Sequence, residues 1–189
     1  QINGVARTFA QVRDHCAHLG HDIRVVSPDQ FKTVPCPTYP QIPLALRPGP
    51  GVRRAFDDFR PDAVHIATEG PVGLAARNLM ARRTIPFTTS YATRLPEYLS
   101  ARVPVPLGWG YAAMRWFHRP SRGIMVATET IRRDLAARGF ATILTWSRGV
   151  DADQFRPGLD PALSLPRPVH LYVGRVAVEV VGPVVGGEL

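Results

Sequence analysis

The stretch DAVHIATEGPVGLAARNLMARRTIPFTTSY, residues 62–91, decides the fold class. It begins with a short apolar run, continues with a helical segment that opens on Gly70-Pro71, and returns to a second apolar run at Ile85. A strand, a helix and a strand in this order predict two parallel strands joined by a crossover helix. The carboxyl ends of such strands meet at one edge of an open sheet, where ligands bind. The stretch therefore predicts a site close to Glu69 and just after Ser90.

The rest of the chain repeats this alternation and predicts an α/β fold, a parallel sheet covered by helices on both faces. Further helices are expected in residues 5–20, 51–61, 107–121 and 128–140, and further strands in residues 21–28, 122–128, 141–147 and 167–174. Thr128 or Thr130 is expected to cap the last helix. No strand precedes the first helix, and the Val- and Gly-rich tail does not resemble the helix expected there. We interpret the sequence as a fragment, or a damaged copy, of a longer protein.

Composition narrows the class of protein. Of the 189 residues, 45% are apolar and 20% are charged, the balance of a globular protein that can bury a core. No apolar run is long enough to span a membrane. Two cysteines in no metal-ligand spacing fit a reducing cytosolic setting. The net charge of +8 suits an anionic partner, but the bases are scattered and aromatic residues make up only 8%, so a nucleic-acid partner is not expected.

Polar side chains crowd the end of the strand that follows residue 84. Five hydroxyl groups fall within six positions, on Thr88, Thr89, Ser90, Tyr91 and Thr93. Arg94 and Glu97 come directly after them. This pattern predicts a binding or catalytic site at the edge of the sheet. The alternatives are strand hydroxyls bonded to nearby backbone, and an exposed ion pair of little energetic value between Arg94 and Glu97.

Two titratable side chains lie at the end of the preceding strand. Glu69 stands between that strand and a helix, a position that suits an active-site carboxylate and equally a side chain that complements the helix dipole. Both interpretations stay open. His65 lies between Val64 and Ile66, and this apolar setting favours a hydrogen-bonded core histidine over a ligand.

Six short motifs along the chain carry a resemblance to a known family. They are QINGVART, DAVHIATEGPVGLAAR, PFTTSYATRLPEYL, MVATETIRRDLAARGF, TWSRGVDADQFRP and LYVGRVAVE. In this order they resemble the bacterial retaining glycosyltransferases of family four, which have the GT-B fold, and especially the GDP-mannose-dependent α-mannosyltransferases. The resemblance implies two Rossmann-like domains across a cleft, the first for the acceptor and the second for the sugar nucleotide. It assigns residues 1–157 to the acceptor-side domain, without its first strand, and residues 158–189 to a linker and the start of the donor domain.

The same resemblance implies roles for individual residues. Tyr91, Ala92 and Thr93 occupy a loop that in the family commonly carries a His at the middle position, and Glu69 joins them as a catalytic candidate. The substrate-binding candidates are Asn3, Gly4, Arg94, Glu97, Tyr98, Arg148 and Asp151. Gly174 and Arg175 are the donor-binding candidates, with Val180 where the family carries a Lys. An imidazole can stabilise developing charge in the transition state, and the side chain of Ala92 cannot.

The implied activity is transfer of a hexose, mannose above all, from a nucleotide sugar to a lipid or glycan acceptor with retention of configuration. The donor, GDP-mannose by resemblance, is a substrate, and no metal or cofactor is expected. The alternative is a truncated, non-catalytic remnant that at most binds acceptor. The aromatic and basic residues within 103–122 suit either a core-packed helix with a basic edge or a helix at an anionic membrane surface. The expected location is the cytoplasm, with peripheral contact at the inner face of the membrane.

Overall fold

The computed structural model describes residues 4–37, 39–147, 149–152 and 155–156. The chain divides into two units, residues 1–147 and 148–189, and all assigned helices and strands lie in the first. The helices are α1 (Gly4–His18), η1 (Pro28–Gln30), α2 (Gly49–Phe59), α3 (Pro71–Arg83), α4 (Leu95–Ser100), α5 (Leu107–His118) and α6 (Glu129–Ala137). The strands are β1 (Thr33–Cys36), β2 (Tyr39–Ala45), β3 (His65–Ile66), β4 (Thr88–Ser90), β5 (Gly123–Val126) and β6 (Ile143–Thr145). The predicted boundary at residue 157 and the predicted strand 167–174 lie outside the described residues.

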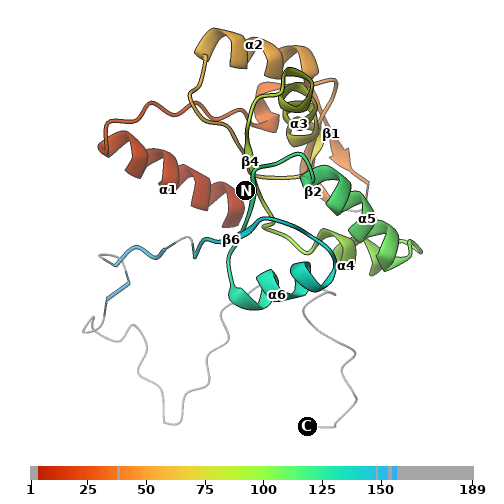
Figure 1. Cartoon of the computed structure of the whole chain (residues 1–189). Helices are drawn as coiled ribbons and strands as arrows, with labels where there is room; N and C mark the ends of the chain where they lie inside the picture. The colour runs from red at the N-terminus through yellow and green to blue at the C-terminus, as the bar shows by residue number, and fades with distance from the viewer. Residues whose placement is uncertain (1–3, 38, 148, 153–154, 157–189) are drawn as a thin grey trace, which may run out of the picture. The chain divides into compact units, whose positions relative to one another are not determined.

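A four-stranded parallel sheet in the order β3-β4-β5-β6 forms the centre of the first unit (Figure 1). The register aligns His65 with Thr88 and Thr88 with Gly123, so neighbouring strands start at the same level. Each connection between neighbouring strands carries a helix: α3 after β3, α4 and α5 after β4, and α6 after β5. The predicted α/β class and its parallel sheet are confirmed.

Two apolar clusters join the sheet to the helices that connect its strands. One combines the sheet residues Ile124 and Val126 with Tyr111 and Met114 of α5 and Leu135 of α6. The other is made of Ile66, Met80, Phe87 and Phe117. Ile66, Ile124 and Val126 alternate with the side chains of the opposite face, because successive residues of a strand point to opposite sides. Helices α3, α5 and α6 therefore cover one face of the sheet.

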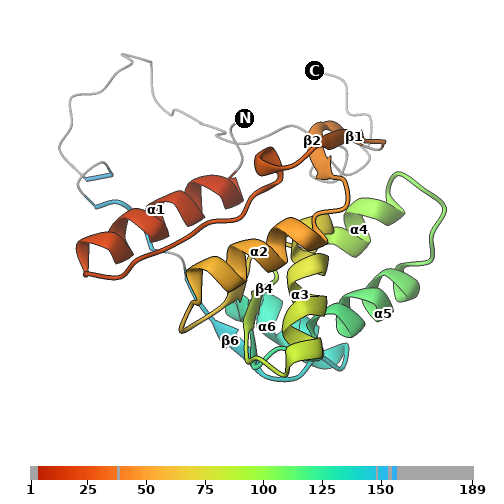
Figure 2. The same ribbon diagram turned by 90° about the horizontal axis from the view of Figure 1, so that it is seen from above.

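Helix α1 covers part of the other face. Its Phe9 ring stacks on His65 of β3, with ring centroids 5.4 Å apart, and lies 5.8 Å from the ring of Trp146. None of the residues of α1 is buried. Figures 1 and 2 show α1 on one side of the strands and α3 and α5 on the other. Helices thus lie on both faces, as the alternation predicts.

The strand predicted for residues 21–28 is wrong. Residues 21–27 form neither helix nor strand, and the 3-10 helix η1 follows. An extended segment is assigned as a strand only when its backbone pairs with a neighbour, and apolar composition alone does not provide that neighbour. The structure has instead an antiparallel hairpin of β1 and β2, which the sequence analysis missed. The hairpin was not predicted because its sequence contains Pro35, Pro40 and Pro43. Pro cannot donate to a strand ladder and therefore argues against a strand.

The glycine at the start of α3 fixes how this helix meets the end of β3. A Cβ atom on Gly73 would lie 1.8 Å from the carbonyl oxygen of Thr68, so no other residue fits without moving the backbone. This close approach holds the segment from Ala67 to Gly70 against the first turn of α3. It therefore positions Glu69, which lies within that segment.

Candidate active site

The carboxyl ends of the four strands bring the predicted segments to one edge of the sheet. Glu69 follows β3, Tyr91 follows β4 and Trp146 follows β6. Backbone bonds extend the pairing beyond the assigned strands: the Tyr91 N–H donates to the Met125 carbonyl at 2.9 Å, and the Trp146 N–H to that of Val126 at 2.7 Å. The loop that starts at Tyr91 is therefore fixed to the sheet where it begins.

His65 is held by the hydroxyl groups of β4. Its Nδ1 lies 2.8 Å from Thr88 Oγ1 and its Nε2 lies 2.8 Å from Ser90 Oγ. The rings of Phe9 and Trp146 cover the imidazole. Burial lowers the pKa of His65 to about 4, so the ring is neutral at neutral pH and one nitrogen donates while the other accepts. The interpretation of His65 as a hydrogen-bonded core histidine is confirmed.

A second histidine, His118 at the end of α5, is buried deeper, with 1% of its surface exposed. Its Nδ1 lies 2.9 Å from Thr89 Oγ1, and Thr89 in turn donates to the Gly123 carbonyl at 3.5 Å. Its Nε2 lies 3.4 Å from Oε1 of Glu69, whose side chain is 7% exposed. Which of Nδ1 and the Thr89 hydroxyl donates depends on the tautomer of His118, and a proton on Nε2 makes the contact with Glu69 attractive.

The structure corrects the expectation for the strand hydroxyls and adds a contact of Glu69. The hydroxyls of Thr88, Thr89 and Ser90 bond to two imidazoles rather than mainly to nearby backbone. Glu69 contacts His118, a partner that the sequence analysis did not identify. The signal was present, since His118 follows Tyr111 and Met114 at helical spacing on the side of α5 that faces the core.

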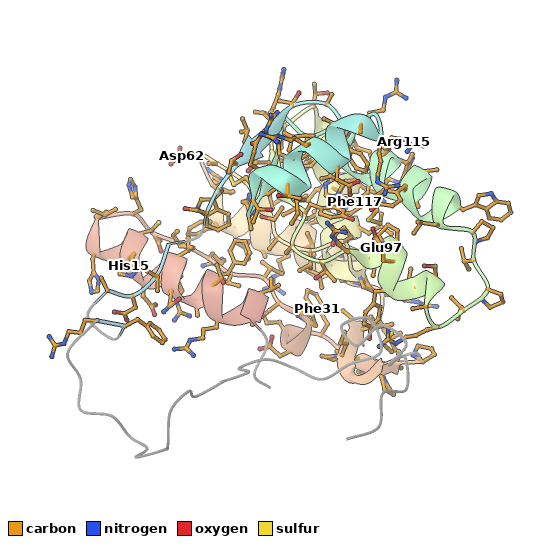
Figure 3. The ribbon with its side chains drawn as sticks, turned by 90° about the horizontal axis from the view of Figure 1, so that it is seen from below. His15, Phe31, Asp62, Glu97, Arg115 and Phe117 are labelled. Atoms are coloured by element: carbon orange, nitrogen blue, oxygen red, sulfur yellow. The ribbon has the colours of Figure 1, made fainter. Side chains whose placement is uncertain are left out.

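Glu97 does not form the exposed ion pair considered as an alternative. The Tyr111 hydroxyl donates to Glu97 Oε1, and Glu97 Oε2 is buried with no hydrogen-bond partner among the described residues. Figure 3 shows Glu97 among the side chains between α4 and α5. The two helices approach closely here, as a Cβ atom built on Gly110 would lie only 2.9 Å from Pro96 Cβ. Glu97 thus ties α4 to α5.

The remaining predicted residues occupy different settings. Tyr91 is 2% exposed, and burial, reinforced by the neighbouring Tyr111, raises the pKa of its hydroxyl well above the usual range. Ala92 is half-buried, whereas Thr93 and Arg94 are exposed in front of α4. The guanidinium of Arg102 lies 3.7 Å from the ring centroid of Tyr98. The exposed side chains of Thr93 and Arg94 are therefore the ones free to meet a ligand at this edge.

Of the other predicted residues, two make local contacts and four lie outside the described residues. Gly4 opens α1, and its carbonyl accepts a hydrogen bond from Thr8 Oγ1 at 2.9 Å. Asp151 lies in the second unit, where its carbonyl accepts from the Phe155 N–H at 2.9 Å. The other four, Asn3, Arg148, Gly174 and Arg175, lie outside the described residues. The described residues contain no group of three or more His, Cys, Asp or Glu placed to hold a metal ion.

Comparison with protein families matches residues 2–154 to glycosyltransferase family 4. The chain belongs to this family. The α/β architecture with a flanked parallel sheet fits the Rossmann-like domains of the GT-B fold that the family has. No solved structure matches the chain significantly. None of the helices in the described part of the chain is long and apolar enough to cross a membrane.

Curated relatives of this family 4 chain are glycosyltransferases. It is 26% identical over 204 residues to a GDP-mannose-dependent alpha-mannosyltransferase of Mycobacterium tuberculosis, covering 95% of the chain and 54% of the relative. It is 29% identical over 209 residues to the enzyme of the same name from Mycolicibacterium smegmatis, covering 94% and 54%. Identity to the sulfoquinovosyl transferase SQD2 of Arabidopsis thaliana is 24% over 206 residues, covering 94% and 40%. The chain spans about half the length of these relatives.

Proposed function

We propose that this protein transfers a hexose from a nucleotide sugar to a lipid or glycan acceptor, with GDP-mannose as the first donor to test and with retention of configuration. The observation that carries the proposal is the family match over residues 2–154, joined to a sheet edge that carries both Glu69 and the loop beginning at Tyr91. Curated relatives named as GDP-mannose-dependent alpha-mannosyltransferases support the choice of donor.

In this proposal the acceptor binds at the carboxyl edge of the sheet. Arg94 is exposed there and offers a forked guanidinium to an anionic acceptor group such as a lipid phosphate. Thr93 offers a hydroxyl beside it. The side chains of Glu69 and Tyr91 are buried, so in this proposal they position the acceptor site rather than contact the sugar. Donor contacts belong to Gly174, Arg175 and the segment around them.

The proposed reaction is a front-side displacement. The bond from the anomeric carbon to the donor phosphate breaks while a bond to the acceptor oxygen forms on the same face of the sugar. The acceptor proton passes to the departing phosphate oxygen, so the products are the glycoside and the nucleoside diphosphate. Orientation of the two substrates supplies much of the rate. The nucleotide sugar is a substrate, and the proposal requires no metal or resident cofactor.

A second candidate function is acceptor binding without transfer, and Ala92 favours it. The family commonly carries a His at this position, and loss of one preorganised polar group costs on the order of a hundredfold in rate. The first proposal therefore assigns the missing stabilisation to the neighbours Thr93 and Arg94, both exposed at the same edge. We place either activity in the cytoplasm, at the inner surface of a membrane.

The test is turnover by the full-length gene product against a panel of nucleotide sugars, with lipid and glycan acceptors. We expect acceptor-dependent release of GDP from GDP-mannose and an α-linked product by NMR. Ala92→His should raise the transfer rate, and Arg94→Ala should raise the KM for acceptor and lower kcat. Acceptor binding without turnover of any donor would favour the second candidate. Absence of both acceptor binding and turnover would overturn both candidate functions.

A further inference from the structure

Helix α5 presents two different faces. Tyr111, Met114, Phe117 and His118 are buried against the core. Trp109 and Trp116 are 74% and 54% exposed, and they are seven residues apart, which places them on the same side of a helix. The two residues between them on that side, Ala112 and Ala113, are also exposed. We call Trp109, Ala112, Ala113 and Trp116 the tryptophan face.

Arginine side chains lie beside the tryptophan face. Residues 70–128 contain eight arginines and one acidic residue, Glu97, so they carry +7 of the net charge of +8. The carboxylate of Glu97 is bonded to Tyr111 inside the α4–α5 contact and does not offset this charge at the surface. The guanidinium of Arg77 lies 4.0 Å from the ring centroid of Trp116, and the exposed Arg119 follows α5 directly. Arg77 and Arg119 thus place positive charge next to an apolar surface.

We propose that the tryptophan face docks on the surface of an anionic lipid bilayer. Indole rings are apolar with one N–H donor and favour the boundary between headgroups and acyl chains. Each arginine near an anionic membrane adds about 1 kcal/mol of attraction. The buried side of α5 keeps the helix in place, so docking requires no unfolding. The resulting contact is peripheral and reversible.

This surface gives a physical basis to the membrane location proposed above, but it does not depend on sugar transfer. Vesicle binding requires neither donor nor turnover. A protein that docks without transferring sugar, or transfers sugar without docking, would separate the two proposals. The membrane is preferred over a protein partner because two large indoles with adjacent arginines match the apolar and anionic layers of a bilayer.

The experiment is co-sedimentation of the full-length gene product with vesicles of phosphatidylcholine alone and with vesicles that also contain phosphatidylglycerol. We expect binding to the anionic vesicles, a blue shift of tryptophan fluorescence and release by salt. The Trp109→Ala/Trp116→Ala variant should bind the anionic vesicles about tenfold more weakly, a loss of roughly 1.4 kcal/mol. Arg119→Glu should also weaken binding.

Two controls keep the result specific. Leu19 lies beyond the end of α1 and is 75% exposed, so Leu19→Ala removes an exposed apolar side chain outside α5 and should leave vesicle binding unchanged. Trp109→Ala alone tests the surface without disturbing the Arg77 contact of Trp116. Equal binding to both vesicle types, or unchanged binding of the double tryptophan variant with native circular dichroism, would overturn the proposal. Loss of self-association by that variant, without vesicle binding, would assign the face to a second copy instead.

Discussion

Glu69 and His118 form a buried contact, in which Nε2 of the imidazole lies 3.4 Å from Oε1 of the carboxylate. Removal of one partner leaves a polar or charged group in an apolar setting, which commonly costs more than the pair contributes. His118→Leu should therefore lower the free energy of unfolding by about 2–4 kcal/mol in urea titrations. The matched control is Arg132→Ala, which breaks an exposed ion pair with Glu129 and should leave the free energy of unfolding almost unchanged. Equal costs for the two variants would contradict this account.

His65 predicts a pH dependence of stability. Its pKa is lowered by burial from 6.5 to about 4 in the folded protein. Between these values the unfolded chain binds a proton that the folded protein does not, so stability falls as pH decreases from about 6.5 to 4 and levels off below. The full shift corresponds to at most about 3 kcal/mol. In chemical unfolding of His65→Gln, stability should no longer fall over this pH range. A dependence of stability on pH equal to that of the unsubstituted protein would refute the assignment.

The junction of β3 and α3 allows a test at the level of one element. Gly73→Ala would place a Cβ atom against the Thr68 carbonyl and push α3 away from the loop that carries Glu69. We expect a loss of about 1–3 kcal/mol in unfolding free energy, as for other overpacked contacts, and weaker acceptor binding. Gly108 in the first turn of α5 has no atom within 4 Å of its Cβ position. Gly108→Ala should therefore be neutral or stabilising, because Ala favours a helix.

Elements with strong periodicity were predictable from the sequence, and elements fixed by distant partners were not. The helices α1, α2, α3, α5 and α6 and the strands β3 to β6 follow from the alternation of helical segments with short apolar runs. The β1–β2 hairpin was missed because its prolines oppose a strand assignment, and α4 because six residues show too little period. For the candidate site, the sequence predicted that Glu69 and the loop after β4 lie at the carboxyl edge of the sheet, where the structure has them. It could not show that Glu97 bonds to Tyr111 or that His118 meets Glu69, since those contacts arise only in the folded chain.

At the scale of the whole first unit, the two faces of the sheet are covered unequally. Helices α3, α5 and α6 bury two apolar clusters on one face. The opposite face receives Phe9 of α1 against His65 and Trp146, and no residue of α1 is buried. Apolar burial is the main favourable contribution to folding, so the packing free energy is concentrated on the first face.

The weak packing of α1 should govern how the molecule opens. A helix without buried residues can detach at a small fraction of the global unfolding free energy. Amide hydrogens of α1 should therefore exchange with deuterium long before those of β5 and α5, as mass spectrometry can measure. A protease should cut first in segment 21–27, which forms neither helix nor strand. A substrate or another domain that binds against Phe9 would then stabilise α1. It would slow both the hydrogen exchange of α1 and the proteolysis of residues 21–27.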